Sequence, residues 1–181
     1  MIRLIKKFLI TFAILLALLS LFSGVAFARA GTVNYEYHIG DNFLGVVHGP
    51  TVVRASNGDT IEITGSGILS VHNKSVSGGG TFVHKDSSGN VLGNGTWTAV
   101  QLLSFKSYGN GVPQGTPEEF EGGLALIRVH LSPGFDAIMQ VDCLLGNPPA
   151  GAEEGVRLAI QGVLNFNKEI SGETLYVRLP S

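Results

Sequence analysis

Cysteine is almost absent from this chain of 181 residues, in which Cys143 is the only one. An intrachain disulfide is therefore excluded, and the fold must be held together by an apolar core. The alternation of apolar and polar residues around position 143 places this side chain on the apolar face of a predicted strand. We therefore interpret Cys143 as a small core residue, in preference to an intermolecular disulfide or a catalytic thiol.

Metal-binding spacings are also lacking. The chain has five histidines, which are His38, His48, His72, His84 and His130. No two of them lie within five residues of each other, so no single element brings two imidazole ligands together. The glycine run at residues 78–80 has neither the lysine nor the following helix of a phosphate-binding loop. We expect neither a metal nor a cofactor.

Charged residues are missing from residues 8–28, a stretch of 21 residues directly after the basic residues 1–7. Overlapping small-x-small motifs end at Ala28 and Ala30. A basic start, an apolar run and a small-residue cleavage site are the layout of a secretory signal peptide. We predict cleavage near Ala28 or Ala30 and a secreted or periplasmic protein. The alternative is an uncleaved anchor, since such a stretch is just long enough to span a bilayer.

Basic residues become scarce once residues 1–30 are removed. Four of the 12 lysines and arginines lie there, but none of the 14 acidic residues does, which leaves eight basic against 14 acidic residues and a formal charge of −6. Nucleic acid and anionic membrane surfaces bind basic proteins. We therefore expect neither as a partner after signal cleavage. The remaining residues 31–181 suit one domain with a sizeable core.

A convincing helix is missing from this domain, whereas strand patterns are frequent. Residues 124–131 and 135–145 alternate apolar and polar side chains, and residues 132–134 form a three-residue turn between them. A register that sets apolar against apolar keeps the two faces of the hairpin distinct. Its pairs are Leu131–Phe135, Val129–Ala137, Ile127–Met139, Ala125–Val141 and, on the other face, His130–Asp136 and Leu124–Asp142.

A third strand is expected over residues 155–166. Helical spacing fits the same stretch, but Gly155 and Gly162 weaken a helix. The register that best matches apolar residues pairs Val141 with Leu158, Met139 with Ile160 and Cys143 with Val156.

Further strand patterns occupy much of the remaining chain. We treat residues 75–80 as a flexible connection, because they contain only serine, valine and glycine, and residues 107–122 as a long loop that forms a rim or lid. Eight to ten strands with glycine-rich turns are typical of all-β proteins. We predict an antiparallel β-barrel of about eight strands, with a β-sandwich as the alternative.

Three runs carry a resemblance to other proteins. Residues 95–99 (Gly-Thr-Trp-Thr-Ala), 103–109 (Leu-Ser-Phe-Lys-Ser-Tyr-Gly) and 141–149 (Val-Asp-Cys-Leu-Leu-Gly-Asn-Pro-Pro) resemble segments of small exported bacterial proteins of unassigned function. The architecture is similar to calycin-like and allene-oxide-cyclase-like barrels. The resemblance implies an exported β-barrel but no activity, since a fold does not carry a function.

Two sets of residues are candidates for function. We assign no catalytic residue; the only candidates are His130 and Asp136, whose cross-strand pairing would orient an imidazole for acid–base chemistry. The pattern favours a solvent face for this pair, because the opposite face holds the large apolar side chains. Those side chains either line a ligand-binding lumen or simply fill the core. The candidates for ligand binding are Phe82, Trp97, Phe105, Met139 and Phe166.

Three functions are consistent with this pattern. The leading hypothesis is an exported, non-catalytic binding domain for a small apolar or amphipathic ligand. The second is a structural or adhesive cell-surface protein. The third is an enzyme of the cyclase or isomerase kind that works inside the barrel.

Overall fold

The computed structural model describes residues 32–44 and 49–180, so the predicted signal peptide lies outside the described residues. Within the described part of the chain, no helix is long and apolar enough to cross a membrane. Regular structure there consists of β-strands and two single-turn 3-10 helices, η2 (Asn42–Leu44) and η3 (Val112–Gln114).

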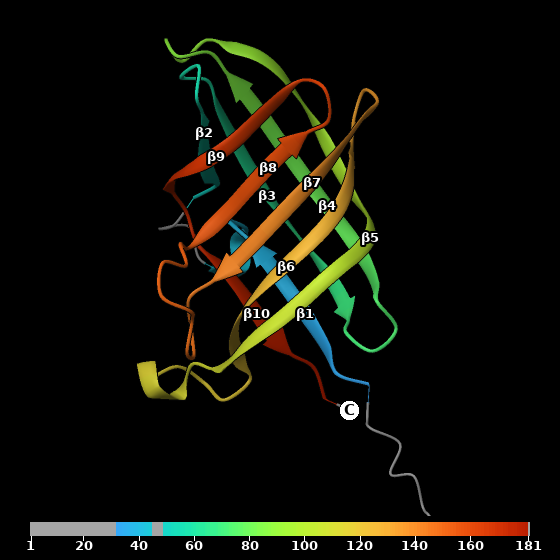
Figure 1. Cartoon of the computed structure of the whole chain (residues 1–181), viewed down its shortest axis with the longest axis vertical. Coiled ribbons are helices and arrows are strands. Elements are labelled where there is room, and N and C mark those ends of the chain that lie inside the picture. The colour runs from blue at the N-terminus through green and yellow to red at the C-terminus, as the bar shows by residue number, and fades with distance from the viewer. Residues whose placement is uncertain (1–31, 45–48, 181) are drawn as a thin grey trace, which may run out of the picture. The chain divides into compact units, whose positions relative to one another are not determined.

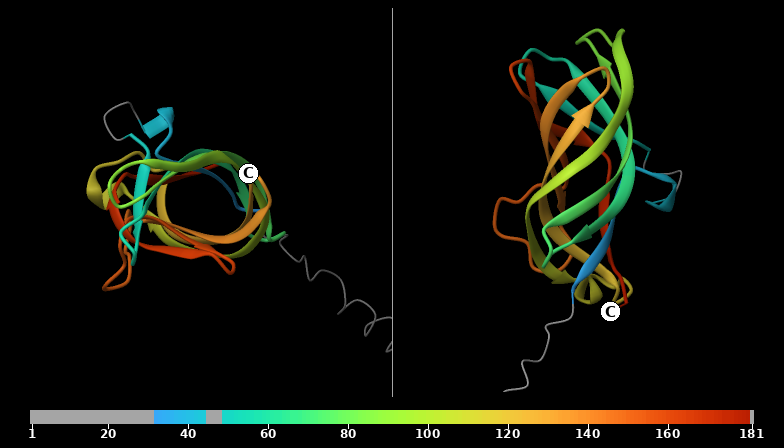
Figure 2. Two further views of the ribbon diagram at one scale, coloured as in Figure 1. Left: turned by 90° about the horizontal axis from the view of Figure 1, so that it is seen from above. Right: turned by 90° about the vertical axis from the view of Figure 1, so that its right-hand side faces the viewer.

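Ten antiparallel strands form one sheet that closes into a ring (Figures 1 and 2). The all-β antiparallel class predicted from the sequence is confirmed. The strands are β1 (Asn34–Ile39), β2 (Thr51–Ala55), β3 (Thr60–Ser70), β4 (Ser75–Lys85), β5 (Val91–Asn110), β6 (Phe120–Leu131), β7 (Phe135–Cys143), β8 (Gly155–Ile160), β9 (Leu164–Ser171) and β10 (Thr174–Arg178).

The ring is split over part of its height, because two of its strands change partners along one edge. β3 pairs first with β2, through residues 60–63, and then with β1, through residues 65–70. β6 pairs first with β10, at residues 120–121, and then with β7, through residues 123–131. One circuit therefore has eight strands (β6, β5, β4, β3, β2, β9, β8, β7), and the other returns from β3 to β6 through β1 and β10.

The first predicted hairpin is confirmed in every pair. β6 and β7 meet with Leu131 opposite Phe135, Ile127 opposite Met139 and His130 opposite Asp136. The alternation turns Ala125, Ile127 and Val129 inward, where they have no exposed surface. Pairing apolar with apolar residues predicted this register correctly, because a shift by one residue would have moved all of these side chains into water.

The predicted register of the next hairpin is wrong by two residues. Val141 pairs with Val156 and Met139 with Leu158, instead of with Leu158 and Ile160. A shift by two residues preserves both faces of a strand, so face matching alone does not distinguish the two registers. The single strand expected over residues 155–166 is also wrong: β8 ends at Ile160, and Phe166 belongs to β9.

The glycine-rich stretch at residues 75–80 is strand and not a flexible connection. It pairs residue by residue with β3, and Gly78 and Gly80 face Gly67 and Gly65. Two aromatic side chains need these glycines: the Trp97 indole Nε1 donates a hydrogen bond to the carbonyl oxygen of Thr64 at 2.9 Å, and the Tyr37 hydroxyl to that of Ser77 at 3.1 Å. A Cβ atom at Gly65 would lie 2.5 Å from the Trp97 ring.

The predicted loop over residues 107–122 is much shorter than expected. β5 continues to Asn110 and β6 begins at Phe120, so only residues 111–119 connect them, with η3 inside. Irregularities in the β5–β6 register allow this long strand to bend around the ring. The connection lies at the lower end in Figure 1, opposite the turns of the β6–β7 and β8–β9 hairpins.

Candidate functional site

The predicted ligand-binding residues meet in the core of the ring. Trp97, Met139 and Phe166 are almost completely buried, and Phe82 and Phe105 pack against the same cluster. Phe105 also contacts the ring of Tyr176, with 5.0 Å between the ring centroids. These side chains therefore pack together in the core of the ring.

His130 and Asp136 are brought together on the outside of the ring. The Nδ1 atom of His130 lies 3.0 Å from Oδ1 of Asp136, but the two side chains are 54% and 64% exposed. Acid–base catalysis gains most from a site that excludes water. Although Asp136 borders a hollow of about 410 Å³, this pair remains open to solvent.

Cys143 is buried, as predicted for a core residue. Burial, followed by the nearby charge of Glu154, raises the pKa of its thiol to about 12. The reactive thiolate form is therefore scarce at neutral pH, which argues against a nucleophilic role.

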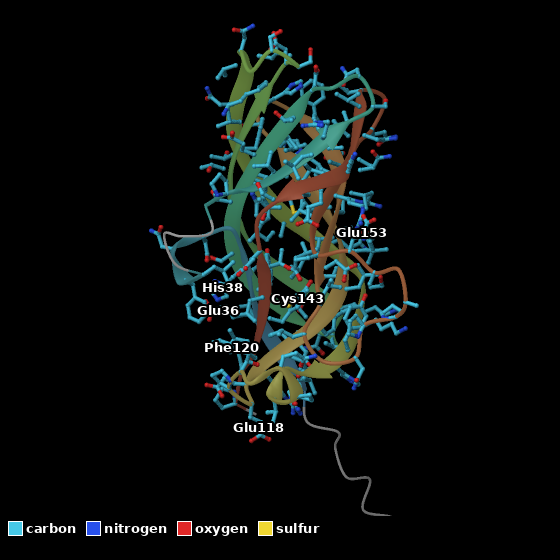
Figure 3. The ribbon with its side chains drawn as sticks, turned by 90° about the vertical axis from the view of Figure 1, so that its left-hand side faces the viewer. Glu36, His38, Glu118, Phe120, Cys143 and Glu153 are labelled. Carbon is cyan, nitrogen blue, oxygen red and sulfur yellow. The ribbon has the colours of Figure 1, made fainter. Side chains whose placement is uncertain are left out.

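A larger concavity lies on the outer side of the ring, beside the split, and we call it the side groove. Its volume is about 540 Å³, within the range of sites for small molecules. Its apolar residues are Phe43, Leu44, Phe120, Leu145 and Leu175, and its other lining residues are Thr116, Cys143, Leu144, Glu154, Glu173 and Thr174. Figure 3 labels Phe120 and Cys143, which line the groove, and His38, whose ring stacks on that of Phe43.

Phe43 is held over the groove by its neighbours in sequence. Asp41 accepts a hydrogen bond from the Phe43 backbone N–H at 3.1 Å, and its other carboxylate oxygen lies 2.8 Å from Nδ1 of His38. The His38 imidazole stacks on the Phe43 ring, with 4.1 Å between centroids and an angle of 13° between planes. Since Phe43 is nevertheless 53% exposed, it forms a wall with one face open to a ligand.

Glu154 joins the two sides of the split at the other end of the groove. Its Oε1 accepts hydrogen bonds from the backbone N–H and the hydroxyl of Thr174, at 2.9 Å and 2.7 Å. Its Oε2 accepts the backbone N–H of Leu144 at 2.7 Å. The Thr174 hydroxyl also lies 2.8 Å from the carbonyl oxygen of Asp142, so its single proton is shared between this oxygen and Glu154. Side chains thus connect β10 with the end of β7, where no backbone pairing exists between these two strands.

Carboxylates gather behind this end of the groove. Burial raises the pKa values of Glu154 and Asp142, although hydrogen bonds with Thr174 and Tyr108 respectively oppose the rise. Burial, followed by repulsion from Glu154, raises the pKa of Glu169 to about 7. Arg157 lowers the pKa values of both Asp142 and Glu169, and it forms an ion pair with Glu153.

Glu169→Gln should make the stability of the protein less dependent on pH. Because folding raises the pKa of Glu169 from 4.5 to about 7, its contribution to stability is complete below pH 4.5 and is lost as the pH rises through 7. Urea unfolding should find the variant about 1 kcal/mol more stable than wild type at pH 8, after allowance for solvent screening. The two should be nearly equal at pH 4.5, and exposed Glu118→Gln should follow the wild-type profile. Parallel profiles for Glu169→Gln and wild type would contradict this assignment.

Sequence reasoning missed the side groove because its walls come from distant segments. Phe43 lies in η2, Phe120 begins β6, Leu145 follows β7 and Leu175 lies in β10. Each looks like an ordinary apolar residue in its own segment, and no spacing connects them. The nearest signal in the sequence is the pair of glutamates before Gly155, Glu153 and Glu154.

Comparison of the chain with protein-family models, with curated proteins and with solved structures found no match. The resemblance to small exported proteins therefore stays a prediction.

Proposed function

We propose that the protein is an exported, non-catalytic binding domain that holds a small amphipathic ligand in the side groove. The observation that carries this proposal is the open apolar wall of Phe43, Leu44, Phe120, Leu145 and Leu175 around a volume of about 540 Å³. Apolar lining with a few polar groups at one end is typical of sites for small molecules. Export rests on the layout of the N-terminal segment.

The location differs from the one that the sequence suggested. Trp97 and Met139 are packed in the core, so the groove outside the ring is the better supported site. Phe43 and Phe120 both line it and lie next to each other, with 6.1 Å between their ring centroids. A ligand with a flat or flexible apolar body would bury surface against both rings, at about 25 cal/mol per Å² of apolar area.

The experiment uses the neutral fluorescent probe N-phenyl-1-naphthylamine. We expect saturable enhancement of its fluorescence by the wild-type protein, and about tenfold weaker binding by Phe43→Ala, because loss of one aromatic wall costs about 1.4 kcal/mol. Phe135→Ala is the matched control, since Phe135 is comparably exposed (46% against 53%) but lies at the β6–β7 turn. Equal losses in the two variants, or no saturable binding by wild type, would contradict the proposal.

A further inference from the structure

Four neighbouring strands, β6, β7, β8 and β9, turn a polar face outward, toward the viewer in Figure 1. Their inward positions hold buried side chains such as Met139 and Phe166, so the residues between them point out of the ring. Two adjoining hollows of about 410 Å³ and 250 Å³ lie on this face and share Ile138, Ala159 and Asn165. We call this concavity the amide furrow, after its lining residues Gln140, Gln161, Asn165 and Asn167.

The small side chain of Ala159 produces the furrow. Across the sheet, Ala159 stands between Ile138 of β7 and Asn165 of β9. Along the chain, its neighbours on the same face are Arg157 and Gln161, which also line the two hollows. Because all four of these side chains are longer than a methyl group, the surface of the sheet dips at Ala159.

The amide side chains of the furrow contribute no hydrogen bond to the fold. None of the four is bonded to another residue in the part of the chain that the structure describes. Asn165 and Asn167 also occupy successive outward positions of β9, although asparagine is depleted in strands. Such departures from local structural preference are expected where a residue serves a function. The amides therefore present unused donors and acceptors around a concave floor.

The charges around the furrow are matched within the protein. Arg128 and Asp136 line the same hollow, and Arg157, at the other hollow, forms an ion pair with Glu153. A charged ligand of either sign would therefore meet a like charge beside each opposite one. The furrow suits a neutral ligand that is rich in hydrogen-bonding groups.

We propose that the amide furrow is a second binding site, which takes a neutral oligosaccharide. A carboxamide presents a carbonyl acceptor beside an NH₂ donor, and a hydroxyl group both donates and accepts. Two neighbouring hydroxyls of one sugar ring can therefore bond to the two ends of one amide. Ile138 and Ala159 supply an apolar floor for the C–H face of such a ring.

The length of the furrow suits more than one sugar unit. Its outward residues on β7 run from Asp136 to Gln140, and four residues of a strand extend about 13 Å. The furrow and the side groove have no lining residue in common among the described residues. The oligosaccharide site is therefore independent of the proposed function.

The test compares three soluble probes: cellopentaose, maltopentaose and the anionic tetragalacturonate. Titration followed by saturation-transfer NMR should show saturable binding of at least one neutral pentasaccharide, with a Kd of about 1 mM or below. Tetragalacturonate should bind about tenfold more weakly, and about 0.5 M salt should leave the neutral affinity unchanged. Failure of both neutral probes to bind, or tetragalacturonate binding as tightly as the better of them, would overturn the proposal.

Two variants test the position of the sugar. Ala159→Phe should abolish binding, because the ring fills the furrow from an exposed strand position that tolerates phenylalanine. Asn165→Ala should weaken binding about fivefold through loss of the amide hydrogen bonds. Val100→Phe and Asn94→Ala are the matched controls, since both residues are exposed in β5 and line neither hollow. Equal losses in a variant and its control would overturn the assigned position.

Exchanged variants distinguish the furrow from the side groove. Phe43→Ala should leave oligosaccharide binding unchanged, and Ala159→Phe should leave binding of the neutral fluorescent probe unchanged. Loss of oligosaccharide binding in Phe43→Ala, with binding retained in Ala159→Phe, would place the sugar in the side groove and reject the amide furrow as its site.

Discussion

Replacing Gly80 by alanine should destabilise the protein by roughly 3 kcal/mol or more, close to the whole stability of a marginal domain. A Cβ atom at this position would lie 1.8 Å from the carbonyl oxygen of Thr64 and 2.6 Å from the Cα atom of Gly65. Both are backbone atoms of β3, so a side-chain rotation cannot relieve the overlap. The two strands would have to separate, with loss of ladder hydrogen bonds between β3 and β4. Urea unfolding followed by circular dichroism measures the change.

Gly93→Ala is the matched control for this substitution. Gly93 also lies in a strand, β5, but no atom lies within 4 Å of the place that its Cβ would occupy. A glycine that tolerates a side chain usually gains about 0.4–1 kcal/mol on replacement by alanine, because the unfolded chain becomes less flexible. Similar destabilisation by the two substitutions would show that the close contact of β3 and β4 is not the cause.

Trp97→Ala should cost about 3–5 kcal/mol in unfolding free energy, the range measured for large aromatic residues removed from cores. Trp97 is 1% exposed and lies against the glycines of β3 and β4. The substitution leaves a cavity among these strands and removes the indole donor from the carbonyl oxygen of Thr64. Urea unfolding followed by circular dichroism measures the loss, because the variant has no tryptophan left to report by fluorescence.

Trp97→Phe separates the two contributions to that loss. Phenylalanine keeps much of the ring but leaves the buried carbonyl oxygen of Thr64 without its indole partner, which costs about 1–3 kcal/mol. We expect this variant to lie between wild type and Trp97→Ala. A Trp97→Phe variant as unstable as Trp97→Ala would mean that the hydrogen bond, and not the packing, dominates.

Local alternation was sufficient to predict the sheet where a short turn restricts the register. Residues 132–134 allow few alignments of their flanking strands, and only one of them hid Ile127, Met139 and Val129 together. The connection from Leu144 to Glu154 gives no such restriction. Two registers that differ by two residues bury the same faces there, and the sequence offered no reason to prefer the correct one.

The glycine run shows a different limit of sequence reasoning. Residues 78–80 have no side chains that would indicate a strand, and their role appears only when Tyr37 and Trp97 are seen packed above them. The same holds for the side groove, whose walls meet only after the ring has closed. A long-range contact of this kind leaves no period in the local sequence.

The pairing of β1 with β10 has a consequence for the protein during its synthesis. β1 is translated long before β10, yet Tyr37 must pair with Tyr176, and β10 must bridge to Glu121, before the ring is complete at that end. Until then, β1 is paired only with β3, and the start of β6 is paired only with β5, so each strand has one unpaired edge. Unpaired strand edges can pair with other chains. Contacts between residues so far apart in sequence also form slowly. The emerging polypeptide therefore depends on being kept apart from its copies until its last strand is free to close the ring.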